Sequence, residues 1–487
     1  MKKQLPERSN LEQLKAQAKD LLNEVRAGQA AALDRIGNET RETFALHDAQ
    51  RILAREYGFE SWAKLKAQIE ARSLEEAKRA FHAAFDADDV LEISRLLKQF
   101  LPPGALLNPL VSRVRSPAML DALIAAGASV DAKSTWWAGG FGVLHQAAPE
   151  LARYAISRGA TVDLHAAARL GLVERVRELL ATDPKLVREK GGDGQTPLHF
   201  ASTVEIAEEL LAHGAEIDAL DVDHVSTPAQ YMIRDREAVA AHLVARGCRT
   251  DLLMLAALGE VERCRKLLER EPGCIRLRVS DEYFPMVGGQ NGGTIYQWTL
   301  GWYVSPLDVA REFRHPEVLK LLWERSPAEV RFLDACWRAD LAAARALAKE
   351  GEISARGLSA ADRRLLAHAA RNNQLGAVQT MLELGFPLDG TSQHGATALH
   401  WAAYHGNAAM TKLLLARGSA LEARDAAFNG PPLGWAIHGS REGWHRKSGD
   451  YGLTAELLLQ AGAKNVEKVA GSEAVQAVLR RFGATDG

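Results

Sequence analysis

The amino-acid sequence predicts an all-α solenoid of stacked helix–turn–helix units, and three observations lead to this fold class. A Thr-x-Leu-His-x-Ala-Ala motif at residues 397–403 is followed by a second apolar helix that ends at Gly418. The same order recurs at residues 196–201, with Gly214 after the second helix. The 487 residues are long for one globular domain, but self-similar units of about 33 residues, each a turn and two short helices, stack in one dimension without that limit.

Further copies of the unit cover most of the chain. They begin at Leu144, Leu164, Thr227, Ser305 and Pro431, with weaker copies near Phe81, Phe332 and Leu365. Proline fits the first turn of a helix, where its missing N–H is not needed, and glycine after the second helix adopts the left-handed conformation that ends it. Over roughly residues 80–487 the chain resembles the ankyrin-repeat family. The resemblance implies that first helices and the turns between repeats (the fingers) line a concave face.

Residues 1–73 lack the repeat and are predicted to form a separate helical segment. Ser9 to Glu12 form a capping box for a first helix with apolar positions from Leu11 to Val25. A second helix is expected over about 48–56, and Ser61 caps a third. The segment resembles an N-terminal helical segment found ahead of repeats in bacterial ankyrin proteins. We expect it to cap the array of residues 74–487, with partner docking as the alternative.

A first departure from the repeat is a long connection at residues 281–303. It combines two Gly-Gly pairs with several aromatic residues, and loops of this length are usually functional or disordered. The aromatic content argues against disorder. Residues 294–303 are predicted to form a β-hairpin-like arm. The glycine pairs do not form a phosphate-binding loop, because no strand–glycine–helix order follows them.

A second departure, at residues 438–451, separates the two helices of the last strong repeat, and an aromatic loop at 134–141 precedes another repeat. Tryptophan concentrates in these loops and at the start of first helices. Seven of the ten tryptophans lie there: Trp136, Trp137, Trp298, Trp302, Trp401, Trp435 and Trp444. Tryptophan combines a large apolar surface with a polar N–H, which suits recognition. The alternative is that these rings only pack irregular loops onto the scaffold.

Composition excludes several classes of function. The net charge is −2 and no basic run occurs, so we expect no nucleic-acid or membrane partner. No apolar run approaches a membrane span, and the N-terminus lacks a secretory signal pattern. The four cysteines lack Cys-x-x-Cys spacing, which favours reduced thiols and a cytoplasmic location.

No motif for catalysis, metal or cofactor binding is present. The histidines at the motif position are expected to link adjacent turns, as the family resemblance implies: His145, His165, His199 and His400. No His-x-x-x-His or His-Glu-x-x-His pattern supports a zinc site, and no nucleophile elbow, Walker loop or dinucleotide fingerprint occurs. We therefore expect no metal, no cofactor and no catalytic residue.

The leading hypothesis is a non-enzymatic binding protein that holds a protein or peptide partner with its concave face and aromatic loops. The candidate binding residues are Trp136, Trp137, Tyr283, Tyr296, Trp298, Trp302, Tyr303, Trp435, His438, Trp444, His445 and Asp450. The alternative is a pocket between the two insertions for a small molecule, such as a carbohydrate-like one. Its polar groups, for binding or catalysis, would be Asp281, Glu282, His438, His445 and Asp450.

Overall fold

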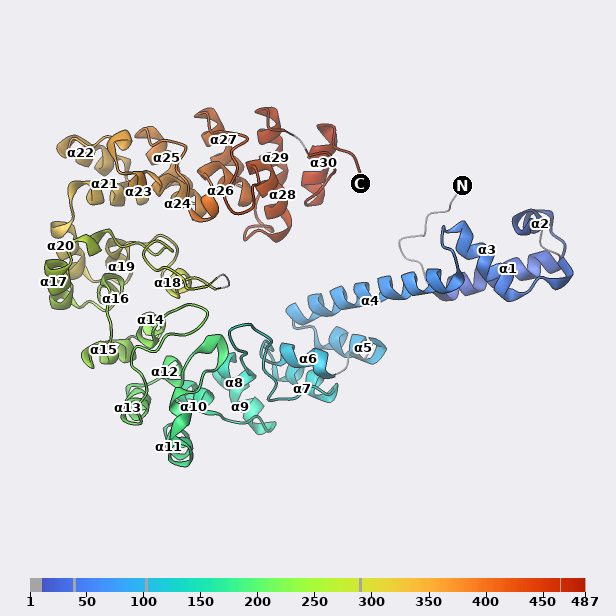
Figure 1. Cartoon of the computed structure of the whole chain (residues 1–487), viewed down its shortest axis with the longest axis horizontal. Helices are drawn as coiled ribbons and strands as arrows, with labels where there is room; N and C mark the ends of the chain where they lie inside the picture. Colours follow the sequence, from blue (N-terminus) through green and yellow to red (C-terminus); the bar gives the residue numbers. More distant parts are fainter. Residues whose placement is uncertain (1–10, 38–40, 101–103, 289–290, 465, 487) are drawn as a thin grey trace. The chain divides into compact units, whose positions relative to one another are not determined.

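The computed structural model describes residues 11–37, 41–100, 104–288, 291–464 and 466–486. The chain divides into two compact units, Met1–Ala166 and Ala167–Gly487, which we describe separately. Helices succeed one another along each unit (Figure 1). The described residues contain no β-strand, only the isolated bridges Thr391–Thr397 and Lys468–Thr485, so the predicted all-α class is confirmed. None of the described helices combines the length and apolar character needed to cross a lipid bilayer.

The first unit begins with the predicted N-terminal helices. Ser61 accepts a hydrogen bond from Lys64 N and caps the third of them, while Ser9 of the proposed capping box lies outside the described residues. Helix α4 runs on past residue 73, and the domain boundary placed there remains a prediction. The helices are α1 (Leu11–Arg26), α2 (Ala30–Ile36), α3 (Leu46–Glu56), α4 (Trp62–Asp86), α5 (Val90–Phe100), α6 (Gly104–Val111), α7 (Pro117–Ala125), α8 (Val143–Gln146), α9 (Pro149–Ser157) and, across the unit boundary, α10 (Leu164–Leu170).

The second unit consists of paired helices with short 3₁₀ turns in the connections. Its helices are α11 (Val173–Thr182), α12 (Pro197–Phe200), α13 (Val204–Ala212), α14 (Pro228–Met232), α15 (Glu237–Ala245), α16 (Leu252–Ala257), α17 (Val261–Arg270), α18 (Tyr296–Thr299), α19 (Pro306–Glu312), α20 (Pro316–Arg325), α21 (Ala328–Trp337), α22 (Leu341–Glu350), α23 (Ala360–Arg363), α24 (Leu365–Arg371), α25 (Leu375–Glu383), α26 (Ala398–Tyr404), α27 (Ala408–Ala416), α28 (Pro432–Glu442), α29 (Tyr451–Gln460) and α30 (Glu473–Arg481). Two 3₁₀ turns matter below, η3 (Gly192–Gly194) and η6 (Gln393–Gly395).

Two of the four motif histidines, His400 and His199, link neighbouring turns as expected, whereas His145 Nε2 pairs with the Asp163 carboxylate. Thr397 N donates to His400 Nδ1 at 3.2 Å, and His400 Nε2 donates to Gly430 O of the next turn at 3.1 Å. His199 makes the same bridge, with Nε2 donating to Ser226 O at 3.2 Å. Each imidazole therefore satisfies a backbone group of its own turn and one of the next, which fixes the spacing of the fingers.

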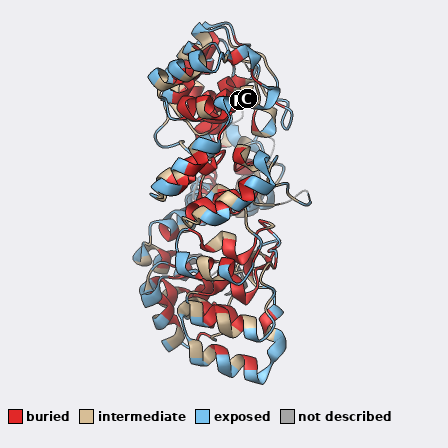
Figure 2. Cartoon of the chain, turned by 90° about the vertical axis from the view of Figure 1, so that its left-hand side faces the viewer, coloured by how far each residue is buried: buried red, intermediate tan, exposed pale blue. Residues whose placement is uncertain are grey.

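Small residues allow the first helices to pack closely. Ala402 and Ala403 of α26 are fully buried where this helix packs against α24 and α28. The second helix of the repeat, α27, ends just before Gly418, whose φ of +82° is the left-handed conformation that glycine adopts without strain. Burial follows this packing, with buried surfaces where helices meet and exposed surfaces outside (Figure 2).

The first insertion does not contain the predicted β-hairpin. Residues 294–303 form the one-turn helix α18 and two turns instead. The reason is that the backbone of the segment bonds within one helical turn and to other parts of the chain, and not across a pair of strands. Ile295 N donates to Ser226 Oγ at 3.1 Å, and Tyr303 N donates to Val279 O at 2.7 Å. Because these partners accept the backbone N–H groups, the segment does not need a second strand to pair with.

The second insertion lengthens a helix and adds a turn. Helix α28 continues to Glu442, and residues 443–450 then form turns before α29. Two glycines let this insertion lie directly on α26: a Cβ at Gly439 would collide with Tyr404 O, and one at Gly449 with His405 O. The insertion is thereby held against the end of a first helix.

Candidate binding site

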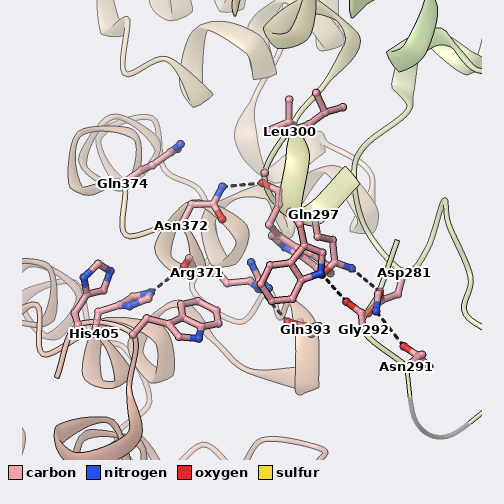
Figure 3. Close-up of a pocket in the computed structure, with 17 residues that line it drawn as sticks. Asp281, Asn291, Gly292, Gln297, Leu300, Arg371, Asn372, Gln374, Gln393 and His405 are labelled. Carbon is pink, nitrogen blue, oxygen red and sulfur yellow. Dashed lines mark hydrogen bonds between the residues drawn. The ribbon is translucent and has the colours of Figure 1, made fainter. Parts of the chain in front are cut away.

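The two insertions of the second unit meet at one cleft of about 870 Å³. Residues of the 281–304 segment form one wall, and the ends of first helices with the 443–450 turn form the other (Figure 3). We call it the Arg371 cleft. Its lining residues are Asp281, Asn291, Gly292, Gly293, Gln297, Trp298, Leu300, Gly301, Trp302, Val304, Arg371, Asn372, Gln374, Gln393, His405, Trp444 and His445.

Arg371, the last residue of α24, is the central charge of the cleft. Its side chain lies between His405 on one side and Gln297 on the other (Figure 3). The residue is only 9% exposed, and its Nε donates to Gln393 Oε1 at 3.0 Å. Its guanidinium carbon lies 4.0 Å from the ring centre of Trp302, and the rings of Trp401 and Trp444 lie within 6 Å of it.

The guanidinium has no anionic partner. Within the described parts of the chain, no carboxylate lies within 4.0 Å of it, and neither terminal nitrogen donates a hydrogen bond. Burial lowers the pKa of Arg371 to about 10, partly offset by the charge of Asp281. The side chain therefore keeps its charge at neutral pH and presents two free N–H groups to the cleft, the arrangement that binds a carboxylate.

Trp302 is a rigid wall rather than a mobile anchor. It is 5% exposed, and its Nε1 donates to His368 Nδ1 at 3.0 Å. Burial, together with the charges of nearby arginines, holds the pKa of His368 well below 6.5, so the imidazole stays a neutral acceptor. Asn372 Nδ2 donates to Trp302 O at 2.7 Å, and the Tyr303 ring stacks on His368 at 3.5 Å.

Two exposed indoles lie on opposite rims of the cleft. Trp298 is 72% exposed, and its Nε1 donates to Gly292 O at 3.0 Å. Trp444 is 57% exposed and stacks on Trp401 at 5.9 Å. One indole comes from each insertion. Because both rings are exposed, each insertion offers apolar area that a ligand would cover.

An aromatic pocket of about 430 Å³ adjoins the cleft and shares Trp444 with it. Two of its three indole N–H groups are already satisfied, because Trp401 donates to Ser392 Oγ at 2.7 Å and Trp435 to Asp425 Oδ2 at 3.0 Å. What remains is a largely apolar surface. The lining residues are His394, Trp401, Tyr404, Phe428, Gly430, Gly434, Trp435, His438 and Trp444.

The remaining candidate residues lie elsewhere. Tyr296 is fully buried and its hydroxyl donates to Asp251 Oδ2 at 2.8 Å, while Tyr303 is 7% exposed. Tyr283 is half-buried outside both hollows, and Asp450 caps α29 by accepting from Leu453 N. In the first unit, Trp136 and Trp137 are about half exposed at 51% and 46%. A further hollow of about 910 Å³ is lined by four arginines and by none of the candidate residues.

Sequence reasoning missed the residue at the centre of the cleft. Arg371 follows the weak copy that begins near Leu365, so no motif marks it. Superposing that copy on the repeat at 397–403 aligns His368 with Trp401 and Arg371 with Tyr404. The signal available in the sequence was the position of this arginine within its repeat. The equivalent position one repeat later is Tyr404, which lines the aromatic pocket.

The polar groups proposed for a catalytic pocket do not converge. Asp281 and His445 line the Arg371 cleft, whereas His438 lines the aromatic pocket. Glu282 lies 3.6 Å from Arg364, and Asp450 is a helix cap. Outside the cleft, the structure brings together Asp193, Asp223 and His224, a set that no sequence motif indicated.

Comparison with known families identifies the repeat. An ankyrin-repeat model matches residues 193–222, and a model of three ankyrin copies matches residues 332–425. The longer match contains Arg371, Gln393 and His405 of the cleft and His394, Trp401 and Tyr404 of the aromatic pocket, so part of each hollow lies on recognised repeats. No curated protein matches the chain. Residues 193–222 and 332–425 of the chain are therefore ankyrin repeats.

Proposed function

We propose that the chain is a non-enzymatic binding protein that holds a peptide segment of a partner protein in the Arg371 cleft and the adjoining aromatic pocket. Ankyrin repeats generally mediate protein–protein interaction, which agrees with a binding role. The observation that carries the proposal is the meeting of both insertions around one unpaired guanidinium.

The chemistry of the cleft favours an acidic group. Arg371 offers two parallel N–H donors inside a cage of indoles, which suits the flat, two-oxygen geometry of a carboxylate. Amide side chains surround it and match the donors and acceptors of a peptide backbone. They are Asn291, Gln297, Asn372, Gln374 and Gln393.

The aromatic pocket favours an apolar side chain next to the acidic one. Trp444 belongs to both hollows, so neighbouring residues of one extended segment reach both. Covering the exposed rings of Trp298 and Trp444 removes apolar area from water, which is the usual energetic basis of an interface anchor.

A small carboxylated molecule is the second candidate. The cleft volume of about 870 Å³ falls within the range of ligand pockets, and the same guanidinium would hold the acid group. This candidate needs no apolar neighbour, so binding would not depend on the aromatic pocket.

The test selects binders from a random peptide library on the full-length chain and measures their affinities. We expect enriched peptides to pair an acidic with an apolar residue. The Trp298→Ala, Trp444→Ala double variant should bind them at least about 30-fold more weakly, since truncating an anchor costs about 2 kcal/mol or more. Both rings are exposed, so the fold should survive.

Phe482→Ala is the matched control, because this aromatic ring is 39% exposed and lies outside both hollows. Equal affinity of the double variant and the wild type would refute the proposal. Failure to enrich peptides, combined with stabilisation by small carboxylic acids that Arg371→Met abolishes, would favour the second candidate.

A further inference from the structure

Three side chains that could ligate a metal converge at two adjacent fingers. Asp193 belongs to η3, and Asp223 and His224 belong to the next turn. His224 Nε2 lies 3.9 Å from Asp193 Oδ2 and 3.8 Å from Asp223 Oδ2. The two turns are tied together by Val222 N, which donates to Asp193 O at 2.8 Å. The repeat geometry itself therefore sets the separation of these ligand atoms.

The tautomer of His224 is fixed by its other nitrogen. Nδ1 lies 2.7 Å from Gly293 O, and because a carbonyl only accepts, Nδ1 carries the proton. In a neutral ring, Nε2 then directs its lone pair at two carboxylates, at distances too long for hydrogen bonds. Such an arrangement is repulsive unless a cation lies between the three groups or Nε2 carries a proton of its own. A histidine whose second nitrogen donates to a carbonyl is also the usual form of a metal-ligating histidine.

Burial makes that repulsion costly. Asp223 is 4% and His224 8% exposed, and the inserted segment covers them through Gly292, where a Cβ would collide with the His224 ring. A buried carboxylate (Asp223) and a partly buried one (Asp193) beside an imidazole lone pair form a concentration of negative potential that a bound cation would neutralise.

The distances suit a small divalent cation after slight contraction. Metal–ligand bonds of about 2.0–2.2 Å at a tetrahedral ion place ligand atoms about 3.4 Å apart. The spacings of 3.8 and 3.9 Å close to that value by rotation of the two carboxylates. We propose that Asp193, Asp223 and His224 bind one divalent transition-metal ion of the zinc type, with one imidazole, two carboxylate oxygens and an open position for water.

The ion would also hold the wall of the Arg371 cleft. His224 Nδ1 donates to Gly293 O, and Gly292 N donates to Asp223 O at 3.0 Å, so two of the glycines of the cleft wall hydrogen-bond to ligands of the ion. Metal binding therefore stiffens the inserted segment. The site itself stands or falls independently of peptide binding, because none of its three ligands lines the cleft.

The test titrates Zn²⁺ into the metal-free full-length chain in competition with a colour-forming chelator. We expect one ion per chain and about 100-fold or greater weakening in each of two variants, Asp193→Asn and His224→Asn. Both variants preserve the fold. Asparagine tolerates the left-handed φ of +54° at position 193, and the amide N–H at position 224 replaces the Nδ1 donor to Gly293. Asp163→Asn, which alters a His–Asp pair at 3.0 Å in the first unit, should leave zinc affinity unchanged.

Cobalt and amide exchange provide independent readouts. Bound Co²⁺ should show ligand-field absorption without a thiolate charge-transfer band, which excludes the buried cysteines as ligands. Zinc should slow hydrogen exchange at Gly292 and Ile295 in the wild type but not in the His224→Asn variant. The proposal is overturned if the chain binds no zinc, if both variants bind it as tightly as the wild type, or if the cobalt spectrum reports thiolate ligands. If a protonated His224 bridges the two carboxylates in place of a metal ion, the chain will bind no zinc.

Discussion

At the scale of single residues, Arg371 links the stability of the fold to the chemistry of the cleft. Its guanidinium carbon lies within 6 Å of the ring centres of three tryptophans, two from the insertions and one from a repeat. Lysine cannot stack as a plane or present two parallel donors, so Arg371→Lys should cost about 1–2 kcal/mol in the free energy of unfolding and weaken binding of acidic peptides. Urea unfolding and peptide titration would check this. Arg446→Lys, on the exposed part of the second insertion, should change neither quantity.

His405 makes a residue-scale prediction about pH. Burial lowers the pKa of His405 to about 4, with the charges of His445 and Arg371 adding to the effect and the hydrogen bond to Arg371 O opposing it. Between pH 6.5 and 4 the unfolded chain therefore binds the extra proton, so the free energy of unfolding falls as pH falls through this window and levels off below it. His405→Gln can keep the donor to Arg371 O and removes this titration.

We expect the variant to lose less stability between pH 7 and 4 than the wild type, by up to about 3 kcal/mol. Urea unfolding at three pH values would measure the difference. Parallel pH profiles for the two proteins would contradict the prediction. The buried His368, whose pKa is lowered in the same direction, remains in both proteins and does not affect the comparison.

At the scale of elements, close helix contacts hold the second insertion against the cleft. A Cβ at Gly439 in α28 would meet the backbone of Tyr404 in α26, which cannot move away without shifting a helix. Gly439→Ala should therefore destabilise the protein by about 1–3 kcal/mol, as overpacked sites do. Gly434→Ala in the same helix meets only the Pro431 ring, and its higher helix propensity should make it neutral or slightly stabilising. Thermal unfolding of both variants would show whether the contact or the helix propensity matters.

At the scale of the whole molecule, the repeats should communicate mainly with their neighbours. Leu210 of α13 is fully buried, and α13 packs against α11, α12 and α15. Leu210→Ala should cost about 2–5 kcal/mol and raise amide exchange in those helices, but not in α27 to α30. Leu414→Ala, in the equally buried core of α27, should give the opposite pattern. Hydrogen-exchange mass spectrometry would distinguish these local increases in amide exchange from a uniform increase along the unit. A uniform increase would indicate that the unit unfolds as one cooperative whole.

The repeat pattern was predictable because its information is local. The Thr–His bridge, the Ala-Ala pair and the terminal glycine lie within a few residues of one another, and His400 and His199 make the expected bridges. The insertions were predicted as departures from this pattern, and Trp298, Trp302, Trp444 and His445 of the candidate set line one cleft. Bacterial origin, cytoplasmic location and the absence of nucleic-acid partners remain predictions.

The sequence by itself determined the helical repeat and the places where it is interrupted, since both depend on contacts between residues close in the chain. Only the tertiary structure decided what the interruptions do. Gly293 and Ile295 bond to a turn 69 residues earlier, which replaced the expected hairpin with a docked helical turn. The same long-range packing surrounds Arg371 with indole rings and brings Asp193 close to Asp223 and His224. Their chemistry comes from partners that no local pattern specifies.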